Sequence, residues 1–253
     1  KKMKQIIIGC DPEFVIIDKE NKVISALDIC NDKDHNNHFG KDMGQGGDVF
    51  ELRPDPSTDV FAVLANIRKI LRLHVQEFLS LKSYKFIGGH IVYGDHMTYS
   101  IGGHIHISAV RINNFVSLDC WEFKDFLDLV ICRGFMHIIN DRKNHILRKQ
   151  HRYGRPKDFR YKYGDSISEF GTIEYRTPPS WLVSPTLAFM FLTLSKICGL
   201  LFINEIEVGS LRRRSGVMGK NILQQLSVIV KTEASMMKEE DVAKCIEILD
   251  GLP

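Results

Sequence analysis

Four short segments of the sequence each carry two charged or imidazole side chains that are separated by one residue. They are Asp11-Pro12-Glu13, Glu51-Leu52-Arg53, His104-Ile105-His106 and Glu174-Tyr175-Arg176. Side chains alternate between the two faces of a β-strand, so each pair shares one face of its strand. Glycine or proline flanks every segment, which permits bulges and close approach of a ligand to the backbone. The spacing predicts four strands that each have one polar face.

If these strands are neighbours in one sheet, their shared face holds four carboxylates, two imidazoles and two guanidiniums. Crowded carboxylates repel one another unless cations neutralise them. Oxygen-rich ligands with one imidazole suit Mg²⁺ or Mn²⁺, and arginine suits phosphate or carboxylate groups. This combination indicates phosphoryl transfer, where positioning and charge neutralisation carry catalysis. Each pair alone also fits a structural role, as a surface ion pair, an incidental His-x-His or a turn, but the recurrence favours function.

The remaining sequence predicts the strands and helices that position these pairs. Strand patterns cover residues 5–17 with a kink, a hairpin partner at 23–27, and residues 50–53, 86–93, 101–110 and 167–177. Helical periodicity covers residues 57–80, 119–139 and 181–203, and a further helix is expected near 239–250. Residues 31–48 and the basic stretch 142–164 are expected to be loops. Hairpins mixed with long helices predict an α+β fold with a mainly antiparallel sheet.

Two predicted helices have recognisable starts. Ser57 or Thr58 is expected to cap the helix over 57–80, and Ser184 followed by Pro185 is expected to begin the apolar helix over 181–203. That apolar helix is interrupted by Pro185 and Lys196, whereas a membrane span needs about 20 uninterrupted apolar residues. We therefore expect a buried core helix and no membrane partner.

Composition narrows the function further. The chain has 253 residues, of which 44% are hydrophobic and 26% charged, and this excludes disordered and collagen-like classes. A net charge of +3 does not argue for nucleic acid, and the basic run Arg212–Arg214 lacks interleaved aromatic residues. The six cysteines show no CxxC spacing, and the first residues lead straight into a strand-like run. We expect a reduced cytosolic protein with ordinary buried thiols.

The segments around the four pairs resemble a known family. In order, they are Gly9-Cys10-Asp11-Pro12-Glu13-Phe14, the stretch from Gly46 to Pro54, Gly102-Gly103-His104-Ile105-His106 and the stretch from Ile173 to Trp181. This set resembles the phage-associated amidoligases, the COOH–NH2 ligases of type 2 in the glutamine synthetase and glutamate–cysteine ligase superfamily. The resemblance implies ATP-dependent amide formation through an acyl phosphate, with two or three Mg²⁺ or Mn²⁺ ions. It also implies a single catalytic domain over residues 1–253, with the nucleotide on a curved antiparallel sheet backed by helices. The cytoplasm would then be that of a bacterium or of a phage-infected host.

The resemblance implies two metal sites. Glu13 and Glu51 would hold the metal nearer the reacting carboxylate. The metal that bridges the ATP phosphates would be held by Asp11, His104 and Glu174. Glu13 would take part in catalysis through the metal ion that it holds.

The same resemblance implies roles for the other polar residues. His106 would face the nucleotide phosphates, Arg176 would stabilise charge on the transferring phosphoryl group, and Arg53 would orient a substrate carboxylate. Asp48 would lie at the amine site or support a ligand. The family pattern has glycine after this aspartate, whereas Val49 stands here, which puts the role of Asp48 in doubt.

The basic stretch at residues 152–160 is a candidate lid over the nucleotide, because an acyl phosphate must be kept from water. Within it, Arg155 and Arg160 are the candidate phosphate contacts. A solvated basic loop explains the same residues, and both interpretations stay open.

Two other functions compete with the ligase. One is a metal-dependent phosphoesterase, or an oxygenase with a site built on His104, His106 and a glutamate, but it leaves Arg53 and Arg176 unexplained. The other is a non-catalytic phage assembly protein that retains the fold. For the ligase we expect small-molecule or peptide carboxylate and amine substrates and no nucleic acid, with an oligomer possible.

Overall fold

The computed structural model describes residues 5–30, 38–42, 47–94, 97–110, 118, 121–135, 146, 150, 152–162 and 172–204. The helix predicted near 239–250 and the basic run Arg212–Arg214 lie outside these residues, as do parts of the predicted loops at 31–48 and 142–164.

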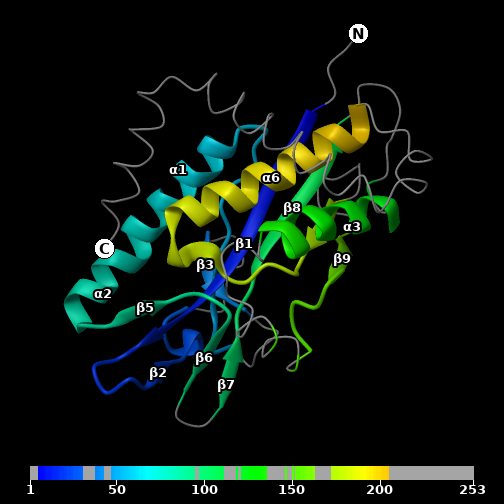
Figure 1. The fold of residues 1–253 in the computed structure, drawn as a ribbon. Coiled ribbons are helices and arrows are strands. Elements are labelled where there is room, and N and C mark those ends of the chain that lie inside the picture. The colour runs from blue at the N-terminus through cyan, green and yellow to red at the C-terminus, as the bar shows by residue number, and fades with distance from the viewer. Residues whose placement is uncertain are drawn as a thin grey trace.

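An open antiparallel sheet forms the centre of the molecule (Figure 1). Its strand order is β3-β4-β1-β8-β10-β9. β2 and β5 also pair with β1, while β6 and β7 form a separate hairpin. The strands are β1 Gln5–Ile17, β2 Val23–Ile24, β3 Phe39–Lys41, β4 Phe50–Leu52, β5 Lys85–Ile87, β6 Ile91–Tyr93, β7 Thr98–Ser100, β8 Gly103–Val110, β9 Phe159–Lys162 and β10 Thr172–Tyr175. The predicted α+β class with a mainly antiparallel sheet is confirmed.

Helices cover one face of this sheet. They are α1 Val60–Ile70, α2 Glu77–Lys82, α3 Trp121–Leu127 and α6 Pro185–Asn204, with π-helices at Leu71–Gln76 and Asp128–Phe135 and 3-10 helices at Ala26–Asp28 and Trp181–Val183. α6 packs on β1 and β8 between α1 and α3 (Figure 1). Within the described ranges, no helix combines the length and apolar character that a membrane crossing needs.

The strands bury their apolar side chains under these helices. Ile105 and Ile107 of β8, together with Ile173 and Tyr175 of β10, belong to the same buried cluster as the apolar residues of α6. Phe50 and Leu52 of β4 are also fully buried in this cluster. Because side chains alternate along a strand, the charged and imidazole residues between them point to the opposite face. The predicted division into an apolar and a polar face is therefore confirmed.

Several predicted boundaries are wrong because tertiary pairing overrides local pattern. Residues Phe39–Lys41 form β3 within the predicted loop, since they pair with β4. Residues Phe159–Lys162 form β9 within the basic stretch, since they pair with β10. The strand predicted at 86–93 divides at Gly89, whose φ of 107° is a conformation that residues other than glycine rarely adopt.

Of the two predicted helix starts, the one for α1 is wrong and the one for α6 is confirmed. Asp59, rather than Ser57 or Thr58, caps α1 by accepting a hydrogen bond from the Phe61 N–H at 2.9 Å. The Ser57 backbone instead exchanges hydrogen bonds with Ile8 of β1, which removes it from the helix. Ser184 caps α6 as predicted, with its hydroxyl 3.4 Å from the Leu187 N–H, and Pro185 is the first residue of that helix.

Gly103 is the first residue of β8, directly before His104, and it packs against Pro179 and Trp181. A Cβ added there would lie 2.4 Å from the Pro179 carbonyl oxygen and 2.4 Å from Trp181 Nε1. The Trp181 indole N–H donates to the Gly103 carbonyl at 2.9 Å, and Trp181 is fully buried. Neither the backbone oxygen nor the buried ring can move away cheaply.

We expect Gly103→Ala to lower the free energy of unfolding by about 3 kcal/mol or more, measured by denaturant unfolding in EDTA. Gly9→Ala is the matched control on β1, because its Cβ would lie 3.3 Å from Pro56 Cβ and 3.4 Å from His106 Cβ. These contacts are tight but ask the neighbours to shift by only a few tenths of an ångström. The control should lose far less. Equal losses in the two variants would contradict this account of Gly103.

Candidate active site

Sheet register gathers the polar pairs on the face turned away from the helices. Asp11 lies opposite His104, and Glu13 lies opposite Glu51. On the far side of β8, Glu174 lies opposite His106. Asp11, Glu13, His104 and Glu174 are all buried, with exposed fractions of 7%, 1%, 3% and 1%. The prediction that these distant segments converge is confirmed.

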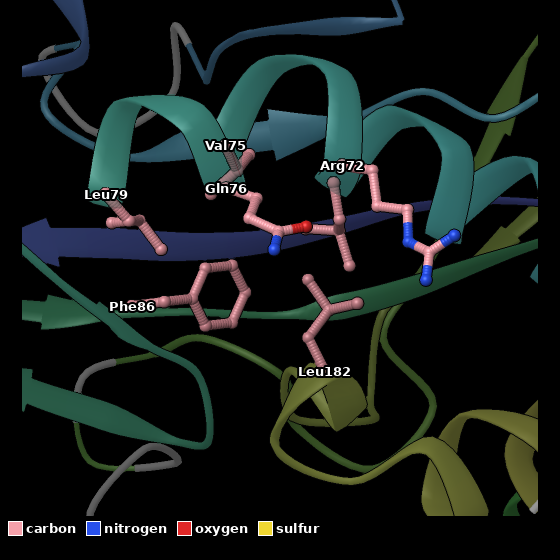
Figure 2. Close-up of a pocket in the computed structure, with 7 residues that line it drawn as sticks. Arg72, Val75, Gln76, Leu79, Phe86 and Leu182 are labelled. Carbon is pink, nitrogen blue, oxygen red and sulfur yellow. The ribbon is translucent and has the colours of Figure 1, made fainter. Parts of the chain in front are cut away.

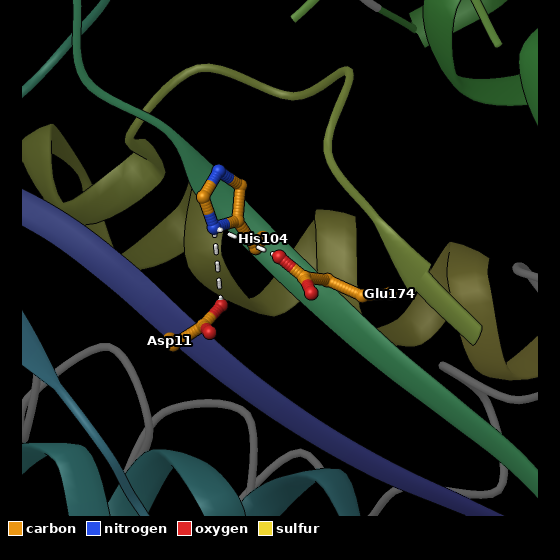
Figure 3. Close-up of side chains that lie close together, drawn as sticks. All are labelled: Asp11, His104 and Glu174. Atoms are coloured by element: carbon orange, nitrogen blue, oxygen red, sulfur yellow. Dashed lines mark ion pairs between the residues drawn. The ribbon is translucent and has the colours of Figure 1, made fainter. Parts of the chain in front are cut away.

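Asp11, His104 and Glu174 form a first cluster of potential metal ligands (Figure 3). His104 Nδ1 lies 3.3 Å from Asp11 Oδ1 and 3.5 Å from Glu174 Oε1. The three donor atoms lie within 4.8 Å of one another. Ligands of an octahedral Mg²⁺ at about 2.1 Å are separated by about 3 to 4 Å, so a small closure of these side chains fits the ion.

A second cluster lies beside the first and contains Glu13, Asp42 and Glu51, again with donor atoms within 4.8 Å of one another. Three carboxylates suit a hard divalent cation. The sequence-based site omitted Asp42, which follows β3 and is tied to Val49 by a backbone hydrogen bond of 2.8 Å. The nearest residue that could have indicated Asp42 is Gly40, two positions earlier, which pairs with Glu51 in the sheet. The composition of residues 31–48 instead predicts a polar loop.

Four side chains that the sequence predicts to contact phosphate groups differ in their position and exposure. They are His106, Arg155, Arg160 and Arg176. Arg176 Nε lies 3.7 Å from Glu174 Oε1 with 16% of its side chain exposed, whereas Arg160 Nη1 lies 3.8 Å from Glu174 Oε2 with 58% exposed. His106 Nε2 lies 3.2 Å from Asp11 Oδ2. Arg155 joins its neighbours through its backbone carbonyl, which accepts from the Thr177 hydroxyl at 2.8 Å, and its side chain is exposed.

Arg53 is held against the second cluster. Its Nε donates to Glu51 Oε1 at 2.5 Å and its Nη2 donates to the Lys41 carbonyl at 3.0 Å. A Cβ at Gly40 would lie 2.6 Å from Arg53 Nη1, so the glycine leaves room for the guanidinium. Arg53 therefore keeps one cation beside the three carboxylates.

Asp48 lies in neither cluster. Its Oδ2 accepts a hydrogen bond from the Tyr99 hydroxyl at 3.1 Å. Val49, which stands where the family pattern has glycine, is fully buried in a small second core with Val15, Tyr99 and Ile101. The valine thus has a packing role, and Asp48 is oriented by Tyr99.

Tyr153 is a site residue that the sequence did not reveal. Its hydroxyl donates to Glu13 Oε1 at 2.6 Å and lies 2.9 Å from His104 Nε2. Its ring lies under the Arg176 guanidinium, 5.5 Å from the ring centroid to Cζ. In the sequence it is one aromatic residue within a basic stretch whose arginines are the more obvious phosphate contacts, and no spacing distinguishes it.

The pKa values of the cluster follow from burial and crowding. Burial, followed by the nearby Asp11 charge, raises the pKa of Glu51 to about 8, although Arg53 opposes the shift. Burial also raises the pKa of Glu13. Burial alone would lower the pKa of His104, but Glu13, Asp11 and Glu174 raise it to about 9. Burial alone would raise the pKa of Asp11, but His106 and His104 hold it well below its usual range.

These shifts predict a pH-dependent stability of the metal-free protein. Between pH 4.5 and about 8 the folded state keeps a proton on Glu51 that the unfolded state has lost, and His104 behaves in the same way between pH 6.5 and about 9. Stability from both groups is therefore lost as the pH rises. The depressed pKa of Asp11 affects stability only at pH values below the usual pKa of an aspartate.

We expect the melting temperature in EDTA to fall from pH 5 to pH 8.5, and Glu51→Gln to reduce that fall. Mn²⁺ should raise the melting temperature more at pH 8.5 than at pH 5, because bound cations replace the protons. A melting temperature in EDTA that is constant or rises over this range would contradict the assignment.

An apolar pocket lies elsewhere in the molecule, between the π-helix Leu71–Gln76, α2, β5 and the 3-10 helix Trp181–Val183 (Figure 2). Its apolar lining is Leu71, Val75, Leu79, Phe86 and Leu182, with Arg72 and Gln76 beside them. None of these residues belongs to either carboxylate cluster. The pocket is therefore separate from the polar face of the sheet.

A comparison with known protein families matches most of the chain. The family model described as "Phage phiEco32-like COOH.NH2 ligase-type 2" matches residues 8–204. This range contains every residue of the two clusters, as well as Tyr153 and the arginines beside them. No curated protein matches the chain significantly.

Proposed function

Since the chain belongs to the phage phiEco32-like family of type 2 COOH–NH2 ligases, and is thereby an enzyme that joins a carboxylate to an amine, we propose that ATP drives this reaction through an acyl phosphate. The observation that carries the proposal is a buried ligand cluster adjacent to a half-buried one, with arginines beside them. Such a site is suited to two anionic reactants, the substrate carboxylate and the nucleotide triphosphate.

The proposed reaction has two steps. A carboxylate oxygen of the acid attacks the γ-phosphorus, the bond from that phosphorus to the bridging oxygen breaks, and ADP leaves. The amine nitrogen then attacks the acyl carbon, the carbon–oxygen bond to phosphate breaks, and the amide and phosphate are released together with the proton of the amine. Repulsion between carboxylate and triphosphate opposes the first step, and the site must overcome it.

The two clusters would hold the cations that remove this repulsion. Glu13, Asp42 and Glu51 would hold one near the reacting carboxylate. Asp11, His104 and Glu174 would hold another beside the phosphates. Divalent cations bound there would neutralise phosphate and carboxylate charge. Because the cluster that contains His104 has a single imidazole among the described residues, it suits Mg²⁺ or Mn²⁺ better than a two-histidine oxygenase site.

The cationic side chains would act on the anionic groups directly. Arg176, which lies beside Glu174 with 16% of its side chain exposed, would stabilise charge on the transferring phosphoryl group. Arg53 would orient the substrate carboxylate, and His106 would face the phosphates from its position against Asp11. Arg160, at the exposed edge of the same carboxylate, would make a more peripheral phosphate contact, and Arg155 would reach the phosphates only from outside the clusters.

Burial of the site also serves the chemistry. Glu13 and His104 are 1% and 3% exposed, and Tyr153 lies across them. An acyl phosphate hydrolyses readily, so exclusion of water favours transfer to the amine.

The acyl phosphate provides the sharpest test. The protein is incubated with ATP, Mg²⁺ or Mn²⁺ and a library of carboxylic acids, with hydroxylamine in place of the amine, and hydroxamate and ADP are measured. An acid that is a substrate should give both products in equal amounts, and amines can then be screened with that acid. Failure to bind ATP in the presence of Mg²⁺ would refute the proposal, as would ADP release that no acid stimulates.

A further inference from the structure

The hydroxyl of Tyr153 touches both metal-ligand clusters at once. It donates to Glu13 Oε1 at 2.6 Å, and Glu13 belongs to the cluster with Asp42 and Glu51. It also lies 2.9 Å from Nε2 of His104, which belongs to the cluster with Asp11 and Glu174. Glu13 Oε1 and His104 Nε2 are themselves 3.7 Å apart. The hydroxyl, the carboxylate and the imidazole are therefore all close to one another where the two clusters meet.

The two ring nitrogens of His104 face different partners. Nδ1 faces Asp11 Oδ1 and Glu174 Oε1 at 3.3 and 3.5 Å, whereas Nε2 faces the Tyr153 oxygen. A histidine that binds a metal through one nitrogen usually donates the N–H of the other to a neighbouring acceptor, which fixes the orientation of the ring. The Tyr153 oxygen can accept this hydrogen bond while its own O–H donates to Glu13. The hydrogen bonds then run in one direction from His104 through Tyr153 to Glu13.

The segment that carries Tyr153 is built to hold it in place. The Gly154 N–H donates to Asp158 Oδ2 at 3.1 Å, and the Asp158 N–H donates to the Thr177 hydroxyl at 3.3 Å. The Asp158 carbonyl in turn accepts from the Arg176 N–H at 2.8 Å. Arg152 and Lys157 have φ values of 59° and 62°, a left-handed conformation that is uncommon outside glycine. The turn is thus anchored to the end of β10, next to Glu174 and Arg176.

We propose that Tyr153 is a positioning residue that couples the two metal sites, because one hydroxyl orients His104 in the first cluster and Glu13 in the second. The inference rests on the proposed function, since it assumes that both clusters bind divalent cations. It differs from a lid, in which the segment only covers the nucleotide and leaves metal affinity unchanged.

Binding of Mn²⁺ to the purified full chain, followed by the loss of the electron paramagnetic resonance signal of the free ion, tests this directly. Tyr153→Phe is compared with the wild type in two further backgrounds. Glu51→Gln impairs the second cluster so that the first is measured, and Glu174→Gln impairs the first so that the second is measured. We expect Tyr153→Phe to weaken Mn²⁺ binding by about 10- to 100-fold in both backgrounds.

Tyr175→Phe is the matched control, because it removes a hydroxyl–carboxylate hydrogen bond of 2.8 Å, to Asp128, on the helix-covered face of the sheet. It should lower the melting temperature without changing Mn²⁺ affinity, whereas Tyr153→Phe should change the affinity with little effect on the melting temperature in EDTA.

The outcomes separate the two proposals. Wild-type protein that binds no Mn²⁺ would overturn the proposed function and this inference with it. If the wild type binds Mn²⁺ but Tyr153→Phe binds it equally well or more tightly, only the coupling role is overturned, and a tighter affinity would show that the hydroxyl competes with the cation. Weakening in one background alone would also overturn the coupling role.

Discussion

Glu13→Gln is expected to lower the rate of amide formation by about 1,000-fold, which corresponds to about 4 kcal/mol of lost transition-state stabilisation. The amide side chain keeps the size of glutamate but lacks the charge that would hold a cation in the cluster with Asp42 and Glu51. The same change should leave the melting temperature in EDTA unchanged or higher. Glu13 is 1% exposed, and burial together with the Asp42 charge raises its pKa, so the ionised form is unfavourable without a metal.

Activity is measured as ADP and amide formation, and stability by thermal unfolding in EDTA. Glu20→Gln is the matched control, because Glu20 is an exposed glutamate whose side-chain contact is an ion pair with the neighbouring Lys19 at 3.5 Å. It should affect neither quantity. A marked loss of stability in Glu13→Gln without metal would indicate that Glu13 is a structural residue.

Arg176→Gln is expected to lower kcat by 1,000-fold or more, the effect of removing an arginine that stabilises phosphoryl transfer. Its guanidinium lies over the Tyr153 ring and beside Glu174 with only 16% of the side chain exposed, so water screens its charge weakly. Because the charge acts in the transition state, the affinity for ATP should change much less than kcat.

Arg160→Gln is the matched comparison, since Arg160 contacts the other oxygen of the same carboxylate but is 58% exposed. An exposed charge is screened by solvent, so this variant should lose less than about 10-fold in kcat. Nucleotide affinity is measured by titration calorimetry, and kcat by ADP release. Equal losses in the two variants, or a loss in Arg176→Gln confined to nucleotide affinity, would contradict the assigned role of Arg176.

The polar face was predictable from sequence because strand geometry has a period of two. Glu51 and Arg53 had to share a face once Phe50 and Leu52 were buried, and their 2.5 Å contact follows from that spacing. The same logic placed His104 between the buried residues of β8. The long apolar helix α6 was equally clear, because Ser184 and Pro185 mark its start.

Asp42 and Tyr153 could not be predicted in the same way. Asp42 follows β3, a three-residue strand that exists only because it pairs with β4. The polar run from residue 31 to 48 has no local pattern that predicts this pairing. Tyr153 belongs to a turn held by Asp158 and Thr177, whose hydrogen bonds join parts of the chain that lie 19 residues apart.

The sequence alone determined the apolar and polar faces of the strands, the main helices and the residue types on which the proposed chemistry depends, because these follow from periodicity within a few residues. Only the tertiary structure decided which strands are neighbours, that Glu13 faces Glu51 while Asp11 faces His104, and that the Tyr153 hydroxyl lies between the two clusters. The physical reason is that hydrogen-bonded register and turn anchoring are set by long-range contacts, which no local pattern encodes.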